Sequence, residues 1–313
     1  MAQLHRDSRN IPSQAQGCVL ALGNFDGVHK GHRALIAEAA KIAGKKNAPL
    51  GVVTFAPHPR RFFQPDSEPF CLTLPPMKQR LLFDLGVDHI FELTFDAALA
   101  DMAAQTFVDD VLARDLRARH VVTGENFLFG KNRSGDVDTL AAAKDRFGFT
   151  ALAPALSAAH QVYSSSAVRG FLKAARFDLA EEMLGWPWAV EAAIEHGDKR
   201  GRELGFPTIN QRVADYVQIP YGIYAVRVQV AGEDFWRDGV SSFGIRPMFE
   251  SPQPLFETFI FDFNREIYGK MARVRPVRHL RPEARFDSLD ALIAQMKEDC
   301  VRAVAVLKSS RDR

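Results

Sequence analysis

One short stretch near the N-terminus constrains the fold more than any other part of the sequence. An apolar run at residues 18–22 is followed by a turn that contains Gly23, Gly27 and Gly31, and a helical pattern begins at His32. A buried strand, a glycine-rich loop and a helix in this order place free backbone N–H groups and the positive end of a helix dipole where an anion can bind. The stretch therefore predicts an anion-binding α/β unit.

Two histidines stand at the start of this helix. His29 and His32 are three residues apart, so both imidazoles can face the same side of the first turn. Two imidazoles beside a cluster of backbone amides suit the α-phosphate of a nucleotide, whereas a metal site would need a third ligand that the neighbouring sequence does not supply. The spacing leaves open the alternative of a tight turn that carries two surface histidines.

Residues 23–32, GNFDGVHKGH, contain a His-x-Gly-His element directly after the predicted strand. This element resembles the signature of the nucleotidylyltransferase superfamily, and the longer string is similar to that of bacterial bifunctional riboflavin kinase/FMN adenylyltransferases (FAD synthetases). The resemblance implies that His29 and His32 stabilise charge while ATP loses pyrophosphate. It also implies ATP contacts from Gly23, Asn24, Phe25 and Gly31.

Composition allows such an enzyme and argues against a nucleic-acid-binding one. The chain has 313 residues, enough for two domains, and its 40 basic and 38 acidic residues give a formal charge of +2. Three cysteines without a CxxC pair indicate reduced thiols, and no apolar run reaches the ~18 residues that span a bilayer. The polar first 16 residues lack the apolar core of a signal peptide. We expect a cytoplasmic protein with small-molecule partners and neither nucleic acid nor membrane; its oligomeric state is not indicated.

The first half of the chain alternates between strand and helix patterns. A helix that ends near Gly44 precedes a strand at 50–55, a helix at 77–85, a strand at 90–93, a helix at 107–116 and a strand at 120–123. This alternation predicts a doubly wound parallel sheet. The resemblance implies, in agreement, a Rossmann-like nucleotidylyltransferase domain.

Two further segments of this half carry polar residues where open α/β sheets bind ligands. His58 follows the strand at 50–55 in a loop that two prolines fix, and a solvated basic loop is the alternative. Residues 124–136 follow the strand at 120–123, and core packing is the alternative for their phenylalanines. Both segments resemble family elements that line the flavin, which implies flavin contacts from His58, Asn126 and Phe129. Asn126 stands where aspartate is commoner, so it keeps an acceptor oxygen without the charge.

Residues 164–169, SSSAVR, open another helix. Serines cap helix N-termini, so the pattern alone is also explained by a capped helix with one surface arginine. The segment is similar to the family's SSTxIR motif, in which serine and arginine hold the triphosphate. Arginine suits this role because its planar fork binds phosphate oxygens bidentately. The resemblance thus implies that Ser165 and Arg169 bind ATP and that His29, His32 and Arg169 converge on it.

Beyond Gly185 the pattern changes to short alternating strands, at 224–230, 238–242, 255–261 and 272–280. These strands predict an antiparallel β-barrel. A helix at 289–307 is expected to cover the barrel with an apolar stripe made of Leu289, Leu292, Ile293, Met296, Cys300 and Val304. We therefore expect an adenylyltransferase domain at 1–185 and a riboflavin kinase barrel domain with a C-terminal helix at 186–313.

A second candidate phosphate site lies at 196–210, HGDKRGRELGFPTIN. Glycines and basic residues before a proline-fixed turn make a phosphate cradle, although a surface charge run fits equally well. The segment resembles the riboflavin kinase motif GDxxGRxLGFPTAN. That resemblance implies ATP contacts from Gly197, Arg200 and Gly205, and Mg²⁺ ligation by Thr208 and Asn210. Hydroxyl and amide oxygens suit this hard cation.

Phosphoryl transfer also needs a group that takes the proton of the attacking hydroxyl. Glu257 lies in an apolar alternating strand, so its carboxylate is either exposed at an edge or functional, because unpaired burial is costly. The family's catalytic glutamate falls at this position, and the resemblance also places Arg281 and Glu283 near the flavin.

The resemblance covers residues 17–305 and implies a bifunctional enzyme that makes FMN and then FAD, with ATP as co-substrate and FMN and FAD as product ligands. Ser242, Met248 and Ala192 depart from the family pattern. One alternative is therefore an FMN adenylyltransferase whose kinase module holds flavin and is weakly active or inactive. A non-catalytic flavin- or nucleotide-binding regulator is another, although binding alone would not require His29, His32, Thr208, Asn210 and Glu257 together.

Overall fold

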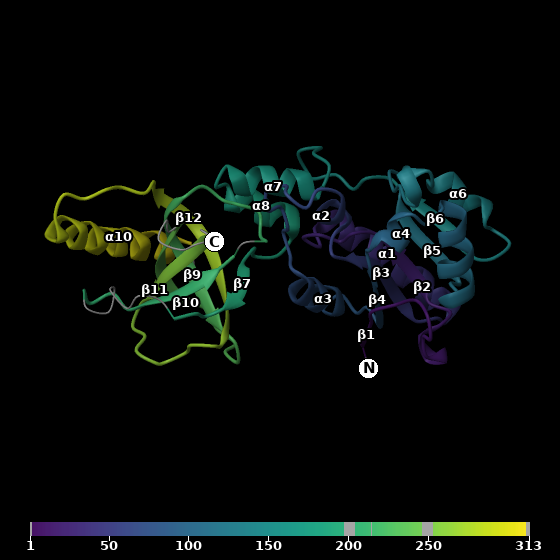
Figure 1. Cartoon of the computed structure of the whole chain (residues 1–313), viewed down its shortest axis with the longest axis horizontal. Helices are drawn as coiled ribbons and strands as arrows, with labels where there is room; N and C mark the ends of the chain where they lie inside the picture. The colour runs from purple at the N-terminus through teal and green to yellow at the C-terminus, as the bar shows by residue number, and fades with distance from the viewer. Residues whose placement is uncertain (1, 197–203, 214, 246–252, 311–313) are drawn as a thin grey trace. The chain divides into compact units, whose positions relative to one another are not determined.

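The computed structural model describes residues 2–196, 204–213, 215–245 and 253–310 (Figure 1). The chain forms two compact units. The first comprises Met1–Ser67 and Thr73–Ser165, and the second comprises Glu68–Leu72 and Ser166–Arg313.

The first unit is built on one sheet in which every strand pair is parallel. In their order across the sheet the strands are β1 (Gln3–His5), β4 (His89–Thr94), β3 (Leu50–Ala56), β2 (Val19–Leu22), β5 (His120–Gly124) and β6 (Gly148–Leu152). The chain leaves β2 toward β3 and later returns to its other side as β5. A ligand crevice in an open α/β sheet lies at such a reversal, outside the carboxyl ends of the strands.

Helices and short helical turns connect these strands. They are η1 (Ser13–Ala15), α1 (Lys30–Lys46), α2 (Pro59–Phe63), α3 (Pro75–Phe83), α4 (Ala97–Ala100), α5 (Ala104–Thr106), the π-type helix η2 (Phe107–Asp115), η3 (Lys131–Arg133) and α6 (Val137–Ala142).

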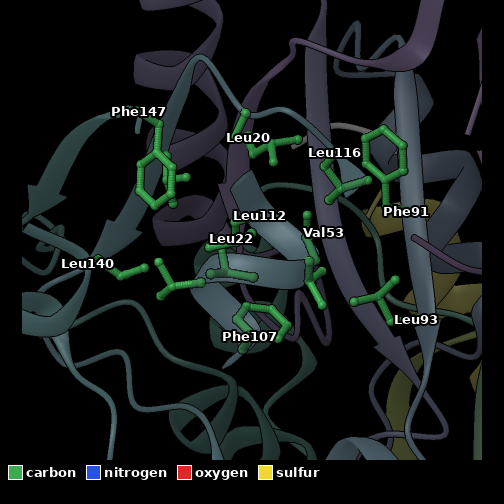
Figure 2. Packing of buried hydrophobic residues seen from close by; sticks show 14 of the residues in the cluster. Leu20, Leu22, Val53, Phe91, Leu93, Phe107, Leu112, Leu116, Leu140 and Phe147 are labelled. Carbon is green, nitrogen blue, oxygen red and sulfur yellow. The ribbon is translucent and has the colours of Figure 1, made fainter. Parts of the chain in front are cut away.

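Both faces of the sheet are covered, as a doubly wound fold requires. Leu20 and Leu22 pack with residues of η2 and α6 in one cluster (Figure 2). Val19 and Ala21, which point to the other face because side chains alternate along a strand, pack with residues of α1 and α3. The predicted α/β architecture is confirmed.

The second unit contains an antiparallel barrel. Across the sheet its strands are β7 (Val190–Ala193), β12 (Met271–Arg281), β9 (Gly222–Val230), β10 (Arg237–Ile245), β11 (Pro254–Ile260) and β8 (Thr208–Arg212). The two outer strands approach each other where the Glu195 N–H donates to the Asn210 carbonyl oxygen at 2.8 Å. The sheet therefore nearly closes, and the predicted barrel is confirmed.

Two helices that precede the predicted boundary at Gly185 lie largely in the second compact unit. They are α7 (Ser165–Lys173) and α8 (Phe177–Leu184). Glu181 of α8 forms a bidentate ion pair with Arg275 of β12, with N···O distances of 2.7 and 2.5 Å. Its packing on the barrel thus places α8 in the second compact unit. The change in sequence periodicity, from which the boundary was predicted, comes only after α8. The functional division at Gly185 stays a prediction.

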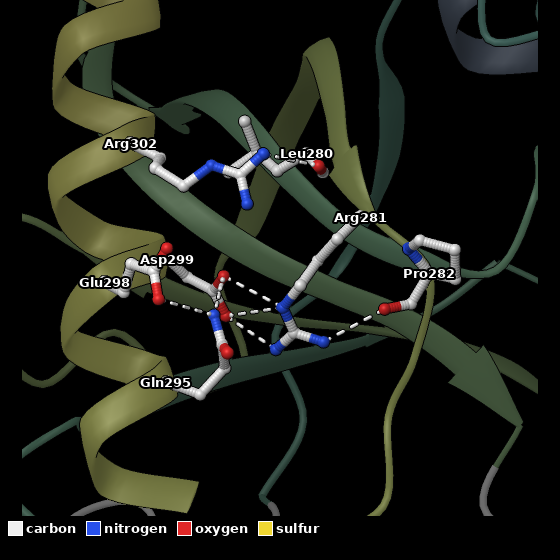
Figure 3. A network of polar contacts seen from close by, with 7 residues as sticks. All are labelled: Leu280, Arg281, Pro282, Gln295, Glu298, Asp299 and Arg302. Carbon is white, nitrogen blue, oxygen red and sulfur yellow. Dashed lines mark hydrogen bonds and ion pairs between the residues drawn. The ribbon is translucent and has the colours of Figure 1, made fainter.

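The C-terminal helix α10 (Leu289–Ser309) packs on β9, β10 and β12, as expected. Its predicted apolar stripe was partly wrong, because Leu289 and Val304 are exposed and the buried residues are Asp299, Ala303 and Leu307. The buried carboxylate of Asp299 is possible because Arg281 donates to it from Nε at 2.9 Å and from a terminal nitrogen at 2.6 Å (Figure 3). A charge pair therefore holds α10 where the sequence pattern indicated an apolar contact.

Replacing Asp299 with asparagine is expected to destabilise the second unit by about 3 kcal/mol, because it leaves the guanidinium of Arg281 with a neutral partner in a buried setting. The chain's tryptophans, Trp186, Trp188 and Trp236, all lie in this unit, so their fluorescence during urea unfolding reports on it selectively. A double variant, R281M/D299L, should lose less stability than D299N, since it removes both charges. Equal unfolding midpoints for D299N and the unsubstituted chain would contradict this account.

Candidate active sites

The glycine-rich loop after β2 is held at the carboxyl edge of the sheet by the end of β3. The Gly23 N–H donates to the Val53 carbonyl oxygen at 3.1 Å, and the Thr54 hydroxyl donates to the Asn24 carbonyl oxygen at 3.0 Å. These bonds fix Gly23 and Asn24 beside the neighbouring strand. Two residues predicted to contact ATP therefore have defined backbone positions.

Unusual backbone conformations follow in the same loop. Phe25 and Val28 have φ values of 52° and 39°, and both side chains are buried in the core beneath the loop. A positive φ is rare for a β-branched residue and is tolerated where surrounding packing imposes it, often at functional sites. Because the Phe25 ring is in the core, only its backbone is suited to the predicted ATP contact.

Asp26 anchors the loop and was missed in the sequence analysis. Its carboxylate accepts from the Thr73 N–H at 3.0 Å, and the Thr73 hydroxyl accepts from the Gly27 N–H at 2.9 Å. The Ser165 hydroxyl donates to the Asp26 carbonyl oxygen at 2.8 Å. The structure thus brings Ser165 to the loop, as its predicted role requires. The one sequence signal for this role was that Asp26 is a carboxylate in a loop expected to bind an anion. A carboxylate there would repel the anion, so it indicates a structural contact rather than a ligand contact.

His29 and His32 lie together at the N-terminus of α1. Their rings stack with centroids 3.7 Å apart, and His29 Nδ1 accepts the His32 backbone N–H at 3.3 Å. A neutral His29 therefore carries its proton on Nε2, from which it can donate. Gly31 allows this packing, since a Cβ there would lie 3.0 Å from His29 Cε1 and 3.1 Å from the Tyr163 carbonyl oxygen.

The His32 imidazole is kept neutral in the free protein. Burial, and then the positive potentials of His29 and Lys78, hold the pKa of His32 well below its ordinary value. Its Nδ1 is buried and has no hydrogen-bond partner within the described part of the chain. A buried polar atom of this kind indicates a partner supplied by water or a ligand. The pair is therefore suited to hydrogen bonding with phosphate oxygens.

Aromatic side chains gather near His58, at the carboxyl end of β3. His58 caps α2, with Nδ1 accepting the Arg60 N–H at 3.1 Å. Phe62 and Phe63 are 37% and 64% exposed, and each ring packs against Phe95, with centroids 5.5 and 5.7 Å apart. Exposed aromatic surface suits a flat, largely apolar ring system. Two adjacent phenylalanines directly after a proline-fixed loop could have predicted this exposed aromatic surface from the sequence.

The loop after β5 places its two predicted flavin residues differently. Asn126 is exposed, whereas Phe129 is buried and packs against Phe107 and Phe127, with centroids 5.6 and 5.8 Å apart. For Phe129 the packing favours the core alternative considered above. Its contact with flavin, like that of Asn126, stays a prediction.

Arg169 belongs to the second compact unit. Its Nε donates to the Phe70 carbonyl oxygen at 2.7 Å, and its guanidinium lies 5.4 Å from the centroid of the Phe70 ring. These contacts orient the side chain. Its convergence with His29 and His32 on one ATP stays a prediction.

On the barrel, strand register brings together residues that are far apart in the sequence. Glu257 of β11 is paired with Asn210 of β8 on one side and with Ser242 of β10 on the other. Directly paired residues on antiparallel strands share a face and lie close together. Thr208 precedes Asn210 by two positions and so shares this face. The predicted base, the two predicted Mg²⁺ ligands and Ser242 therefore form one cluster, which we call the Glu257 row.

The Glu257 row faces away from the barrel interior. The alternate residues of the same strands are buried, and the hydroxyls of Ser241 and Thr258 lie 2.8 Å apart in a hydrogen bond. Gln211 also points inward, donating to the Ala272 carbonyl oxygen at 2.9 Å. The row therefore lies on the opposite face of the strands, where Thr208, Ser242 and Glu257 are half-buried and Asn210 is buried.

The three residues predicted to bind ATP in the kinase module precede β8 in the sequence. Gly197 and Arg200 lie outside the described residues. Gly205 has a φ of 87°, a left-handed conformation that glycine adopts at no steric cost, immediately before the buried ring of Phe206. This residue therefore makes the turn that leads into β8.

Arg281 and Glu283 lie at the end of β12. The guanidinium of Arg281 is engaged by Asp299, which favours a role in anchoring α10 (Figure 3). Glu283 is exposed near Gly244 and Tyr221, and burial, followed by the charge of Glu283, raises the pKa of Tyr221. Flavin contacts from Arg281 and Glu283 stay predictions.

Comparison with known proteins assigns each half of the chain to a domain family. Residues 11–167 match the family described as FAD synthetase, and residues 184–307 match the family described as riboflavin kinase. The bifunctional riboflavin kinase/FMN adenylyltransferase of Escherichia coli K12 is 38% identical over 95% of both chains. That of Bacillus subtilis 168 is 33% identical over 96% of both chains.

A solved structure is similar to this chain over most of its length. A Streptococcus pneumoniae crystal structure, described as a macrolide-efflux protein, superposes with a TM-score of 0.81 at 28% identity, covering 95% of this chain and 97% of that one. Among the described residues, no helix has the length and apolar character needed to cross a membrane. With both domain families in the expected order and relatives that match over nearly the full length, the chain belongs to the bifunctional riboflavin kinase/FMN adenylyltransferase family.

Proposed function

We propose that the chain makes FAD from riboflavin in two ATP-dependent steps, with the kinase at residues 186–313 and the adenylyltransferase at residues 1–185. The observation that carries the proposal is that each unit has its own cluster of suitable side chains. The first unit has the stacked His29–His32 pair on an anion-binding loop, and the second has the Glu257 row.

In the kinase step, Glu257 accepts the proton of the riboflavin 5′-hydroxyl while the oxygen of that hydroxyl attacks the γ-phosphorus of ATP. The bond from that phosphorus to the bridging oxygen breaks, and ADP leaves with the electron pair, giving FMN. Thr208 and Asn210 offer a hydroxyl and an amide oxygen on the same face as Glu257, a donor set that fits Mg²⁺. Bound there, Mg²⁺ would neutralise charge on the phosphates. Gly197, Arg200 and Gly205 are proposed to hold these phosphates.

In the adenylyl transfer step, a phosphate oxygen of FMN attacks the α-phosphorus of a second ATP. The bond to the β-phosphate oxygen breaks, and pyrophosphate leaves with the electron pair, giving FAD. The attacking phosphate is already anionic at neutral pH, so no general base is needed. Catalysis is therefore positioning and charge stabilisation, to which His29 and His32 contribute hydrogen bonds.

Other residues of this step bind and orient. Ser165, Arg169 and the backbone of residues 23–31 are proposed to hold the triphosphate. The exposed rings of Phe62 and Phe63 beside His58 support a position for the isoalloxazine ring at the carboxyl end of β3. We place this activity in the cytoplasm, with riboflavin, FMN and ATP as partners and no nucleic acid.

Purified chain incubated with riboflavin, ATP and Mg²⁺ is expected to accumulate FAD by way of FMN, as chromatographic separation of the flavins would show. Removing Mg²⁺ with EDTA should stop the kinase step. FAD formed from FMN but not from riboflavin would instead indicate a kinase module that only holds flavin, in line with Ser242 beside Glu257. No product from either flavin would overturn the proposal in favour of a binding protein.

A further inference from the structure

A buried lysine, whose charge acts on His32, lies next to the glycine-rich loop. Lys78 is on α3 and is 6% exposed. Its ammonium group donates to the Thr54 hydroxyl at 3.1 Å and to the Phe55 carbonyl oxygen at 3.2 Å. Lysine is seldom so completely buried without a specific reason, because desolvating its charge is costly. Both acceptors lie near the carboxyl end of β3, at the edge of the sheet where the loop begins.

Hydrogen-bond chemistry gives this contact a direction. An ammonium group can only donate, so Thr54 must use a lone pair to accept from Lys78. The single hydroxyl proton of Thr54 is then committed to its other partner, the Asn24 carbonyl oxygen at 3.0 Å. Thr54 is fully buried, so water does not compete for these positions. Lys78 therefore orients Thr54, and Thr54 holds the loop backbone at Asn24.

The charge of Lys78 also acts on the histidine pair. Together with burial and the neighbouring His29, it holds the pKa of His32 below its ordinary value. A positive charge that disfavours protonation of an adjacent imidazole also favours the binding of an anion beside that imidazole. A low local dielectric constant strengthens both effects. Lys78 thus contributes geometry through Thr54 and potential through its charge.

We propose that Lys78 is a positioning residue for adenylyl transfer, which fixes the Asn24 backbone through Thr54 and places a positive charge beneath the loop that receives the ATP phosphates. This inference rests on the adenylyltransferase function proposed for the first unit. It assigns to α3 a role in the site that the motif residues alone do not reveal.

The test compares variants of the full-length chain. Lys78→Met keeps the length of the side chain but removes the charge, and is expected to lower the rate of FAD formation from FMN by about 10²-fold, the cost typical of misplaced reacting groups. Lys78→Arg should recover much of this loss. Riboflavin phosphorylation by the same preparation should be unchanged, which controls for folding. Lys45→Met, at an exposed position on α1, should leave both rates unchanged.

Two measurements separate positioning from a merely structural role. NMR titration of the His32 imidazole should show a higher pKa in Lys78→Met, because a neighbouring positive charge has been removed. Thr54→Val breaks the link to Asn24 but keeps the charge, so it should slow FAD formation while leaving the His32 titration near that of the unsubstituted chain.

The outcomes that overturn the proposal are distinct. Unchanged FAD formation in Lys78→Met, with normal turnover by the unsubstituted chain, would overturn this inference alone. A slow Lys78→Met variant with an unaltered His32 titration and no rescue by arginine would reduce Lys78 to a structural residue. Failure of the unsubstituted chain to make FAD would overturn the proposed function and this inference with it.

Discussion

Replacing Glu257 with glutamine is expected to lower riboflavin phosphorylation by about 10²–10⁴-fold, the usual cost of losing a general base. Glutamine keeps the size of the side chain and one acceptor oxygen, so strand pairing with Asn210 and Ser242 should persist. It does not accept the proton of the ribityl hydroxyl. FMN adenylylation should be unaffected, because the His29–His32 pair lies on the other sheet.

The measurement is paired: riboflavin-to-FMN and FMN-to-FAD rates are determined on one preparation. Normal FMN-to-FAD turnover excludes general misfolding as the cause of a lost kinase rate. Glu266→Gln, at an exposed position of the same unit, is the matched control and should keep both activities. If Glu257→Gln phosphorylates riboflavin as fast as the unsubstituted chain, Glu257 is not the base, and the Glu257 row is not the kinase site.

His29→Asn is expected to reduce FAD formation from FMN by about 10²–10³-fold, the range found when one charge-stabilising donor is removed. Asparagine is a better choice than alanine here. The His29 side chain caps α1 by accepting the His32 N–H, and losing a cap costs about 1 kcal/mol of stability. Asparagine is a good capping residue, so it preserves the helix start while removing the imidazole.

Production of FAD and release of pyrophosphate are the readouts, with riboflavin phosphorylation as the internal control. His160→Asn provides a matched exchange at an exposed histidine of the first unit. His160 has a φ of 58°, which asparagine tolerates well, so this control should be silent. FAD synthesis at the normal rate in His29→Asn would remove His29 from the site and leave the loop as a structural turn.

The predicted architecture was confirmed where periodicity was strong, and the misses have physical causes. Strand β1 was not predicted, because three mostly polar residues have no pattern of their own. It exists through pairing with β4, in which His5 stacks on Phe91 with ring centroids 5.1 Å apart. The stripe predicted on α10 was wrong at Leu289 and Val304, which are exposed. Asp299 is buried on this helix instead, since helical spacing does not show that Arg281 can make a carboxylate acceptable in the interior.

Sequence by itself determined the local conformation of the motif segments and the chemistry that is predicted for them. The loop with His29 and His32, the turn at Gly205 and the alternating strand of Glu257 are short segments in which neighbouring residues define the conformation. Only the tertiary structure decided which distant residues complete them. Lys78 reaches Asn24 through Thr54, and Ser242 lies beside Glu257, because sheet register and helix packing set these distances. Burial gives such contacts their strength, and burial is a property of the assembled chain rather than of any segment.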